Sequence, residues 1–148
     1  MSAIGKRVIY AGAVDSAHDK PLHVEGVAVD AFLPGTVLKQ SASGIETSDV
    51  AATVFGQQTL IADKDQMRSK SVDDAWTISE NAVAISPRSG EFLNVLVATA
   101  QVLIVGTALT RNTSGLLVVA ATDGTEEIVA HSDEALTTSG TTLVRVRF

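Results

Sequence analysis

Alternation of apolar and polar side chains is the clearest pattern in this chain, and it is sharpest at the end of the sequence. There Val144, Val146 and Phe148 fall on one side of an extended backbone, and Arg145 and Arg147 fall on the other. Successive side chains of a β-strand point to opposite faces of its sheet. The pattern therefore predicts a C-terminal strand with one buried face.

Other short runs rich in Val, Ile, Thr and Ala are separated by the turn formers Gly, Ser, Asn and Asp. Residues 23–30 alternate less cleanly, Gly26 within them marks a bulge or a close approach, and Pro34 and Gly35 mark the turn that follows. This composition predicts an all-β fold. The remaining strands are expected at residues 59–62, 82–86, 92–99, 101–105, 116–121 and 127–131.

Two segments lack this pattern. Residues 1–20 carry scattered charge and little periodicity, which indicates an extended N-terminal arm, with room for one short strand at residues 7–10. Residues 63–75 are polar and densely charged, as in a long exposed loop or one short helix. Residues 21–148 are then predicted to form a single β domain, because this length suits one hydrophobic core.

An internal repeat organises the rest of the chain. Residues 35–45, GTVLKQSASGI, align without gaps on residues 106–116, GTALTRNTSGL. Each copy has a Gly turn, a short apolar strand, a polar loop ending in Ser-Gly and a returning strand, which is a β-hairpin. Since one hairpin is marginal in water, we expect the two hairpin-containing halves to complete one compact β-barrel, β-tulip or sandwich.

Charge and composition narrow the choice of partners. Eleven basic and seventeen acidic residues give a net charge of −6, which disfavours a nucleic-acid partner that would be bound through its phosphates. No run of about 18 apolar residues is present, so no membrane partner is expected. The chain has no cysteine, and its N-terminus lacks the apolar region of a secretory signal.

No catalytic or cofactor-binding pattern emerges from the sequence. The histidines His18, His23 and His131 have no metal-ligand spacing, and neither a G-x-S-x-G elbow nor a phosphate-binding Gly loop occurs. Asp63 and Asp65 lack the accompanying residues of a calcium loop. We therefore expect no enzyme activity, no cofactor and no metal, and we interpret the acidic residues as solvated loops.

Residues 87–101, PRSGEFLNVLVATAQ, are followed by VGTAL at residues 105–109 and SGL at residues 114–116. Residues 33–38, LPGTVL, look similar to the same element. These stretches resemble a family of small tailed-phage head proteins, the capsid decoration or cement proteins. In this family an apolar strand leads through a G-x-x-L turn into a hairpin, and the chain packs as a compact β-barrel or β-tulip.

The resemblance implies a structural virion protein that binds the outer surface of a phage capsid, at junctions between subunits of the major capsid protein, and stabilises the shell. It implies a homo-oligomer, with trimers at three-fold positions favoured over dimers at two-fold positions. The protein would be made in the host cytoplasm and end on the capsid exterior. A host-surface or carbohydrate-binding β module is the alternative, but six aromatic residues are few for a glycan groove.

Two sets of residues are candidates for the interface with the capsid or with another subunit. The first is the arm, which we expect to order on the capsid by adding a strand to a sheet edge. In this hypothesis its apolar residues anchor the strand and its basic residues meet acidic capsid side chains. The residues concerned are Lys6, Arg7, Val8, Ile9 and Tyr10.

The second set lies at the ends of the repeated hairpins. Lys39 and Arg111 occupy equivalent loops of the two copies, and we expect these loops to face the shell or a neighbouring subunit. Trp76, the single tryptophan, is either a core residue or an interface anchor of the type enriched at binding hot spots.

Overall fold

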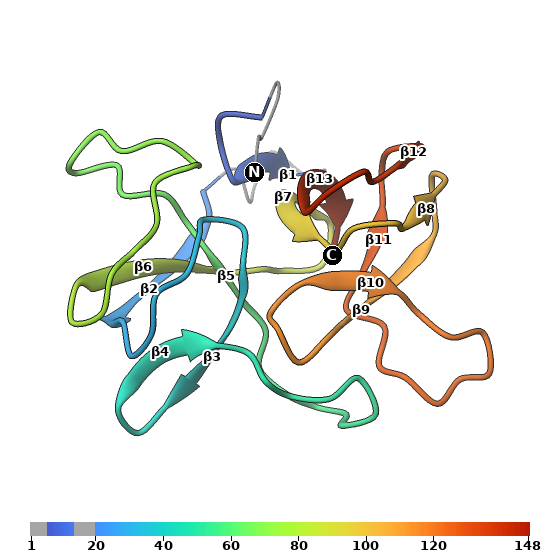
Figure 1. Ribbon diagram of the computed structural model, residues 1–148, viewed down its shortest axis with the longest axis horizontal. Helices are drawn as coiled ribbons and strands as arrows, with labels where there is room; N and C mark the ends of the chain where they lie inside the picture. The colour runs from blue at the N-terminus through green and yellow to red at the C-terminus, as the bar shows by residue number, and fades with distance from the viewer. Residues whose placement is uncertain (1–5, 14–19) are drawn as a thin grey trace.

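The computed structural model describes residues 6–13 and 20–148, and every regular element in these ranges is a β-strand (Figure 1). The predicted all-β class is therefore confirmed. Within the described ranges, no helix is long and apolar enough to cross a membrane. Most of the predicted arm, residues 1–5 and 14–19, lies outside the described residues.

Five strands of the C-terminal half close into a mixed β-barrel. Strand β7 pairs antiparallel with β13 on one side and parallel with β10 on the other, so the sheet returns to the strand from which it began. The predicted C-terminal strand is confirmed as β13, with Val144 and Val146 buried in the core. In order around the barrel the strands are β7 (Glu91–Val97), β10 (Leu117–Val119), β9 (Ala108–Arg111), β11 (Ala130–Ser132) and β13 (Thr142–Arg147).

The N-terminal half forms an antiparallel sheet of its own, which we call the first sheet and which lies beside the barrel (Figure 1). Its two ends approach each other just past β2, where Ala28 bridges to Ile45 and the amide of Val29 donates to the Ile45 carbonyl at 2.9 Å. In sheet order the strands are β2 (Leu22–Val27), β6 (Asn81–Ser86), β5 (Leu60–Ala62), β3 (Val37–Ser41) and β4 (Gly44–Thr47).

Three short strands complete the fold. Strand β1 (Tyr10–Ala13) pairs antiparallel with the first part of β7, three residues later than the strand predicted at residues 7–10. Strands β8 (Val102–Leu103) and β12 (Leu136–Thr137) form a two-stranded ribbon. The ribbon lies at the side of the barrel that faces away from the first sheet (Figure 1).

Both copies of the internal repeat are hairpins, as predicted. The first copy is β3–β4 and the second is β9–β10. The expected barrel is present, but the C-terminal half alone builds it, because the two hairpins belong to different sheets. The reason is that each half has enough strands to approach closure by itself, and the halves then join through the outer face of the first sheet.

That outer face is a row of three aliphatic side chains in register across neighbouring strands. Val37 lies opposite Ile61, Ile61 lies opposite Ile85, and all three are fully buried in the same cluster as the barrel core. Their neighbours Leu38 and Leu60 point the other way, into the separate core of the first sheet. These strands are apolar on both faces because each face covers a different core.

Two glycine turns bring the backbones of the two halves together. The amide of Val37 donates to the Gly115 carbonyl at 2.8 Å, and the amide of Leu96 donates to the Gly35 carbonyl at 2.9 Å. Gly115 has a φ of +73°, and a Cβ there would lie 2.8 Å from the Val37 carbonyl oxygen and 2.6 Å from Thr47 Cγ2. A side chain at Gly115 would therefore push the hairpin away from β3.

Substitution of Gly115 tests this close approach, and Gly124 provides a matched control. Gly124 has a φ of +75° but open space around its missing Cβ. We expect Gly124→Ala to lower the free energy of unfolding by about 1 kcal/mol through backbone strain alone. Gly115→Ala should cost about 1–3 kcal/mol more, because it adds overpacking. Urea denaturation measures both, and equal losses would show that the contact between the halves is not tight.

Candidate functional site

Two of the three predicted apolar anchors of the arm, Ile9 and Tyr10, pack inside this chain. Ile9 is only 1% exposed and belongs to the barrel core, and Tyr10 begins β1 opposite Leu93. Asn94 on β7 holds the segment twice: its amide donates to the Ile9 carbonyl at 2.7 Å and its side chain to the Val8 carbonyl at 2.8 Å. Donation of this strand to another sheet would require Ile9 to leave the core.

Of the two basic side chains of the arm, Lys6 is paired within the chain and Arg7 is exposed. Lys6 pairs with Glu134 at 2.5 Å, and the backbone carbonyl of Arg7 accepts a hydrogen bond from Lys64 Nζ at 3.1 Å. The side chains of Arg7 and Val8 are exposed. Of the five arm residues, only these two present their side chains largely to solvent.

Lys39 is paired with one acidic residue of its own hairpin and with one of the loop that follows it. Its ammonium group lies 2.5 Å from Asp49 and 3.3 Å from Glu46. These two carboxylates, Asp49 first, raise the pKa of Lys39 above its usual value. The charge that was predicted to meet a partner is therefore balanced locally by two acidic neighbours.

Arg111, the second predicted hairpin residue, points into the molecule. Its side chain is 2% exposed, and Nη2 donates to the Val54 carbonyl and to Glu127 Oε2, the latter at 2.8 Å. The residue therefore does not present its charge to the surroundings. It ties the loop after β4 to the loop after β10.

These two loops, residues 48–59 and 120–129, form one unit at the edge of the junction between the halves. The Glu127 amide donates to the Ala52 carbonyl at 2.8 Å, and the Gly56 amide donates to Glu127 Oε1 at 3.2 Å. Together with Arg111, these bonds fix the backbone on both sides of Phe55. A loop anchored in this way presents its side chains in a defined arrangement.

The side chains that this unit presents are apolar. Val54, Phe55 and Ile128 are exposed, and we call them the Phe55 tip. All six aromatic residues lie in the described ranges, and Phe55, at 58% exposure, is the one in the exposed class. Aromatic side chains in a fixed loop are the usual anchors of protein interfaces.

Both loops that form the Phe55 tip carry acidic residues. Asp123 and Glu126 lie in the same loop as Ile128, and the exposed Asp49 begins the loop that carries Phe55. The nearby cations, Arg111 and Lys39, are already paired with carboxylates of this chain. The tip therefore suits a partner surface with an apolar pocket and basic side chains around it.

The Phe55 tip was not predicted from the sequence, and Arg111 was expected at the surface. The available signal was an apolar pair, Val54-Phe55, followed by Gly56 inside an otherwise small and polar loop. Periodicity gives no weight to such a pair, because it belongs to neither a strand nor a helix pattern. Pairing of Arg111 with Glu127 depends on the fold and has no sequence signature.

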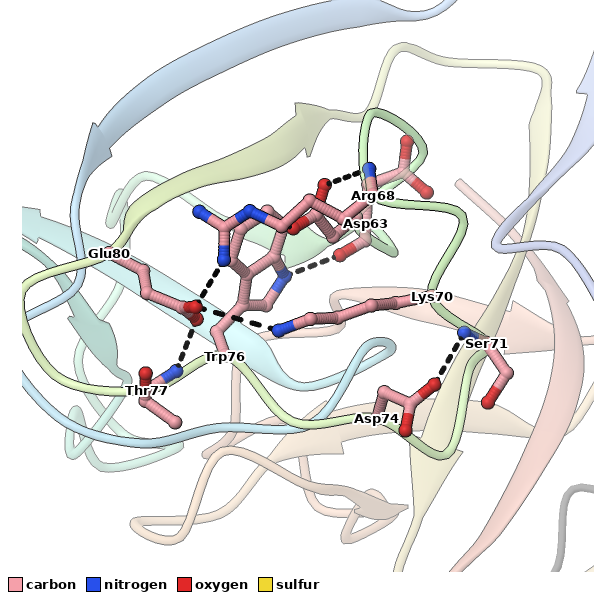
Figure 2. A network of polar contacts seen from close by, with 9 residues as sticks. Asp63, Arg68, Lys70, Ser71, Asp74, Trp76, Thr77 and Glu80 are labelled. Carbon is pink, nitrogen blue, oxygen red and sulfur yellow. Dashed lines mark hydrogen bonds and ion pairs between the residues drawn. The ribbon is translucent and has the colours of Figure 1, made fainter.

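Trp76 is a core residue, which decides between the two predicted roles. It is buried in the core of the first sheet, and its Nε1 donates to the Asp63 carbonyl at 2.7 Å (Figure 2). Residues 63–75 form a loop without a helix. The loop is not wholly exposed as expected, because Asp63, Asp65 and Val72 are buried where it folds back over Trp76.

Glu80 forms ion pairs with two basic residues of this loop (Figure 2). Its carboxylate accepts a hydrogen bond from the Thr77 amide at 2.8 Å and pairs with Arg68 at 2.5 Å and Lys70 at 3.5 Å. The Thr77 amide, the Arg68 guanidinium and Lys70 lower the pKa of Glu80 to about 2. The ionised carboxylate is therefore the form that holds the loop.

The cavity between the two halves has no acidic or basic side chain among the residues that line it. Its volume is about 390 Å³, and the polar side chains that line it are the hydroxyl groups of Thr36, Thr47, Ser114 and Thr141. Hydroxyl groups alone provide no acid or base near neutral pH. Within the described ranges, no group of three or more His, Cys, Asp or Glu side chains is arranged to hold a metal ion.

His23 and Asp63 line a second cavity of about 210 Å³, and their side chains lie 3.2 Å apart. The Asp63 carboxylate also accepts hydrogen bonds from Gln66 Nε2 and from the Lys64 amide. These bonds engage both oxygens of the carboxylate in local structure. The pair therefore does not have the arrangement of a base waiting for a substrate.

The fold is similar to that of a solved phage protein, the N base of head fiber gp8.5 of bacteriophage phi29. The two superpose with a TM-score of 0.54 and 14% sequence identity, over 87% of this chain and 94% of the other. At this level of identity the likeness is one of fold. No protein-family model and no curated protein matches the sequence.

The acid response of the Glu80 network is testable. Because the folded-state pKa of Glu80 lies below its ordinary value, its contribution to stability is present above about pH 4.5 and disappears as pH falls through about 2. We expect Glu80→Gln to be less stable than wild type at pH 6 and to lose less stability between pH 6 and pH 2.5. Urea midpoints at the two pH values measure this, with Glu25→Gln on β2 as control. Parallel pH curves for wild type and Glu80→Gln would contradict the assignment.

Proposed function

We propose that this protein is a structural component of a phage head, located on the capsid exterior, where it binds the major capsid protein and stabilises the shell. The observation that carries the proposal is the fold shared with the phi29 head fiber base over nearly the whole of both chains. The sequence resemblance to capsid decoration proteins supports the same assignment from residues 87–116. The chain would act by binding, without turnover.

The Phe55 tip is the surface that we assign to capsid contact. It combines an exposed aromatic side chain with a backbone fixed by Arg111 and Glu127, so little conformational entropy is lost on binding. The acidic residues of its two loops favour a shell site with basic residues around an apolar pocket. Neither Lys39 nor Arg111 is needed as a charged contact in this arrangement, since both are neutralised within the chain.

Co-sedimentation with empty expanded shells of the major capsid protein from the same phage tests this proposal. We expect saturable binding at a fixed ratio to capsid subunits and a higher melting temperature of the shells. Phe55→Ser should weaken binding roughly tenfold or more, as the loss of an interface anchor does. Ile78→Ser is the matched control, because Ile78 is also an exposed apolar residue in a loop.

The outcomes separate the function from the surface. If the wild-type protein fails to pellet with any form of the shell, capsid binding is wrong, and the host-surface or glycan-binding alternative is the next to examine. If Phe55→Ser pellets as well as wild type, the protein is a capsid ligand but the assigned tip is wrong. The thermal melt of each variant should stay within a few degrees of wild type, because neither side chain is buried.

A further inference from the structure

We propose that Asp123 and Gly124 form a modification site, at which the backbone of the folded protein isomerises to isoaspartate without an enzyme. They are the single Asp-Gly pair of the chain, and the chain has no Asn-Gly pair. Both residues are exposed in the loop 120–129, which also carries Ile128 of the Phe55 tip. The chemistry at this pair is independent of what the protein binds, whereas its effect on binding rests on the proposed function.

The nucleophile of the reaction is the amide nitrogen of Gly124. Most backbone amides of a folded protein are held in hydrogen bonds. In the part of the chain that the structure describes, the Gly124 amide donates none to the protein. Apart from its chain neighbours, no atom lies within 4 Å of the position that a Cβ of Gly124 would take. The nitrogen is therefore accessible, and the turn has room for a ring to form.

The electrophile is the carboxyl carbon of Asp123, whose side chain folds along its own backbone. Oδ1 of Asp123 accepts hydrogen bonds from the Thr125 amide at 3.1 Å and from Thr125 Oγ1 at 2.6 Å. Such an Asx turn closes a ring of atoms that contains both the carboxyl carbon and the Gly124 nitrogen. The two reacting atoms therefore stay close to each other before the reaction starts.

The same hydrogen bonds make the reaction slow. The hydroxyl and then the amide of Thr125 lower the pKa of Asp123, because both donate to the ionised carboxylate. An ionised carboxylate is a poor electrophile, so the reaction proceeds through the small protonated fraction. We therefore expect isomerisation over weeks rather than hours.

The reaction releases one water molecule and consumes one. The Gly124 nitrogen forms a bond to the protonated carboxyl carbon of Asp123, and the amide proton leaves with the carboxyl hydroxyl group as water. Water then adds to one of the two carbonyl carbons of this succinimide and breaks the bond of that carbon to the nitrogen. Opening at the main-chain carbonyl leaves the backbone running through the side-chain carbon, which is isoaspartate. Opening at the other carbonyl restores aspartate, and the mass of the chain is unchanged in both cases.

Isoaspartate adds a methylene group to the backbone inside a closed turn. The Ala121 amide donates to Glu126 Oε2 at 2.7 Å across this turn. The next residue, Glu127, accepts the Gly56 amide at 3.2 Å and so anchors the loop that carries Phe55. A longer backbone between Ala121 and Glu126 shifts this anchor, so we expect the modified protein to bind the shell more weakly.

Storage of the purified protein for several weeks at neutral pH and 37 °C tests the site. Labelling by an isoaspartyl methyltransferase should rise with time, and electron-transfer fragmentation should place the isoaspartate at residue 123. Asp123→Glu keeps the carboxylate but cannot form the five-membered ring, so its label at this position should stay at background. Gly124→Ala crowds the nitrogen and should show several-fold less label than wild type.

Two results would overturn the modification site. The first is a wild-type protein that forms isoaspartate at residue 123 in urea but not in buffer, because the fold then protects the pair. The second is a rate in Gly124→Ala equal to that of wild type, because access to the nitrogen then has no influence.

Shell co-sedimentation of stored and fresh protein tests the effect on binding. We expect stored wild type to lose binding in proportion to its isoaspartate, and Asp123→Glu stored in the same way to keep its binding. Equal pelleting of modified and unmodified chains would overturn the link between this turn and the Phe55 tip. Failure of fresh protein to pellet would overturn the proposed function, while the labelling experiment still decides the modification site.

Discussion

The packing of one β-sheet onto the outside of a neighbouring barrel is the interaction on which this molecule depends. The row formed by Val37, Ile61 and Ile85 is fully buried, and it joins the barrel core although it belongs to the other sheet. Burial of three such side chains contributes several kcal/mol. Gly115 and Gly35 then fix the distance between the halves through backbone hydrogen bonds. Where residues of both halves form one surface feature, their relative positions therefore depend on this junction.

Arg111 connects two loops, one from each half, next to the junction. A buried guanidinium is costly unless it is paired, and here two of its nitrogens, Nε and Nη1, have no hydrogen-bond partner. Its remaining nitrogen serves both Val54 and Glu127, one on each of the two loops. An aliphatic residue could fill the same space but could not join two loop backbones. The arrangement therefore favours a defined loop shape over maximal stability.

The strands were predictable from the sequence because alternation and turn residues are local signals. Val144 and Val146 are buried as their pattern indicates, and Gly26 is a close approach, since a Cβ there would lie 2.8 Å from Ile45 Cγ1. Strand partners were not predictable, since the parallel pairing of β7 with β10 depends on distant segments. The surroundings of the candidate site residues were not predictable for the same reason. The burial of Arg111 and the exposure of Phe55 depend on contacts between residues far apart in sequence.

The two-loop construction of the Phe55 tip couples binding to the internal cohesion of the molecule. One loop follows β4 of the first sheet and the other follows β10 of the barrel, so the tip exists only while the halves are docked. A partner that contacts both loops binds the form with docked halves more tightly than a form in which the halves are separated. By thermodynamic linkage, such a partner makes separation of the halves harder by the same free energy. Attachment would then stabilise the docked form, and a force applied to either half would separate the two halves least easily while the protein is bound.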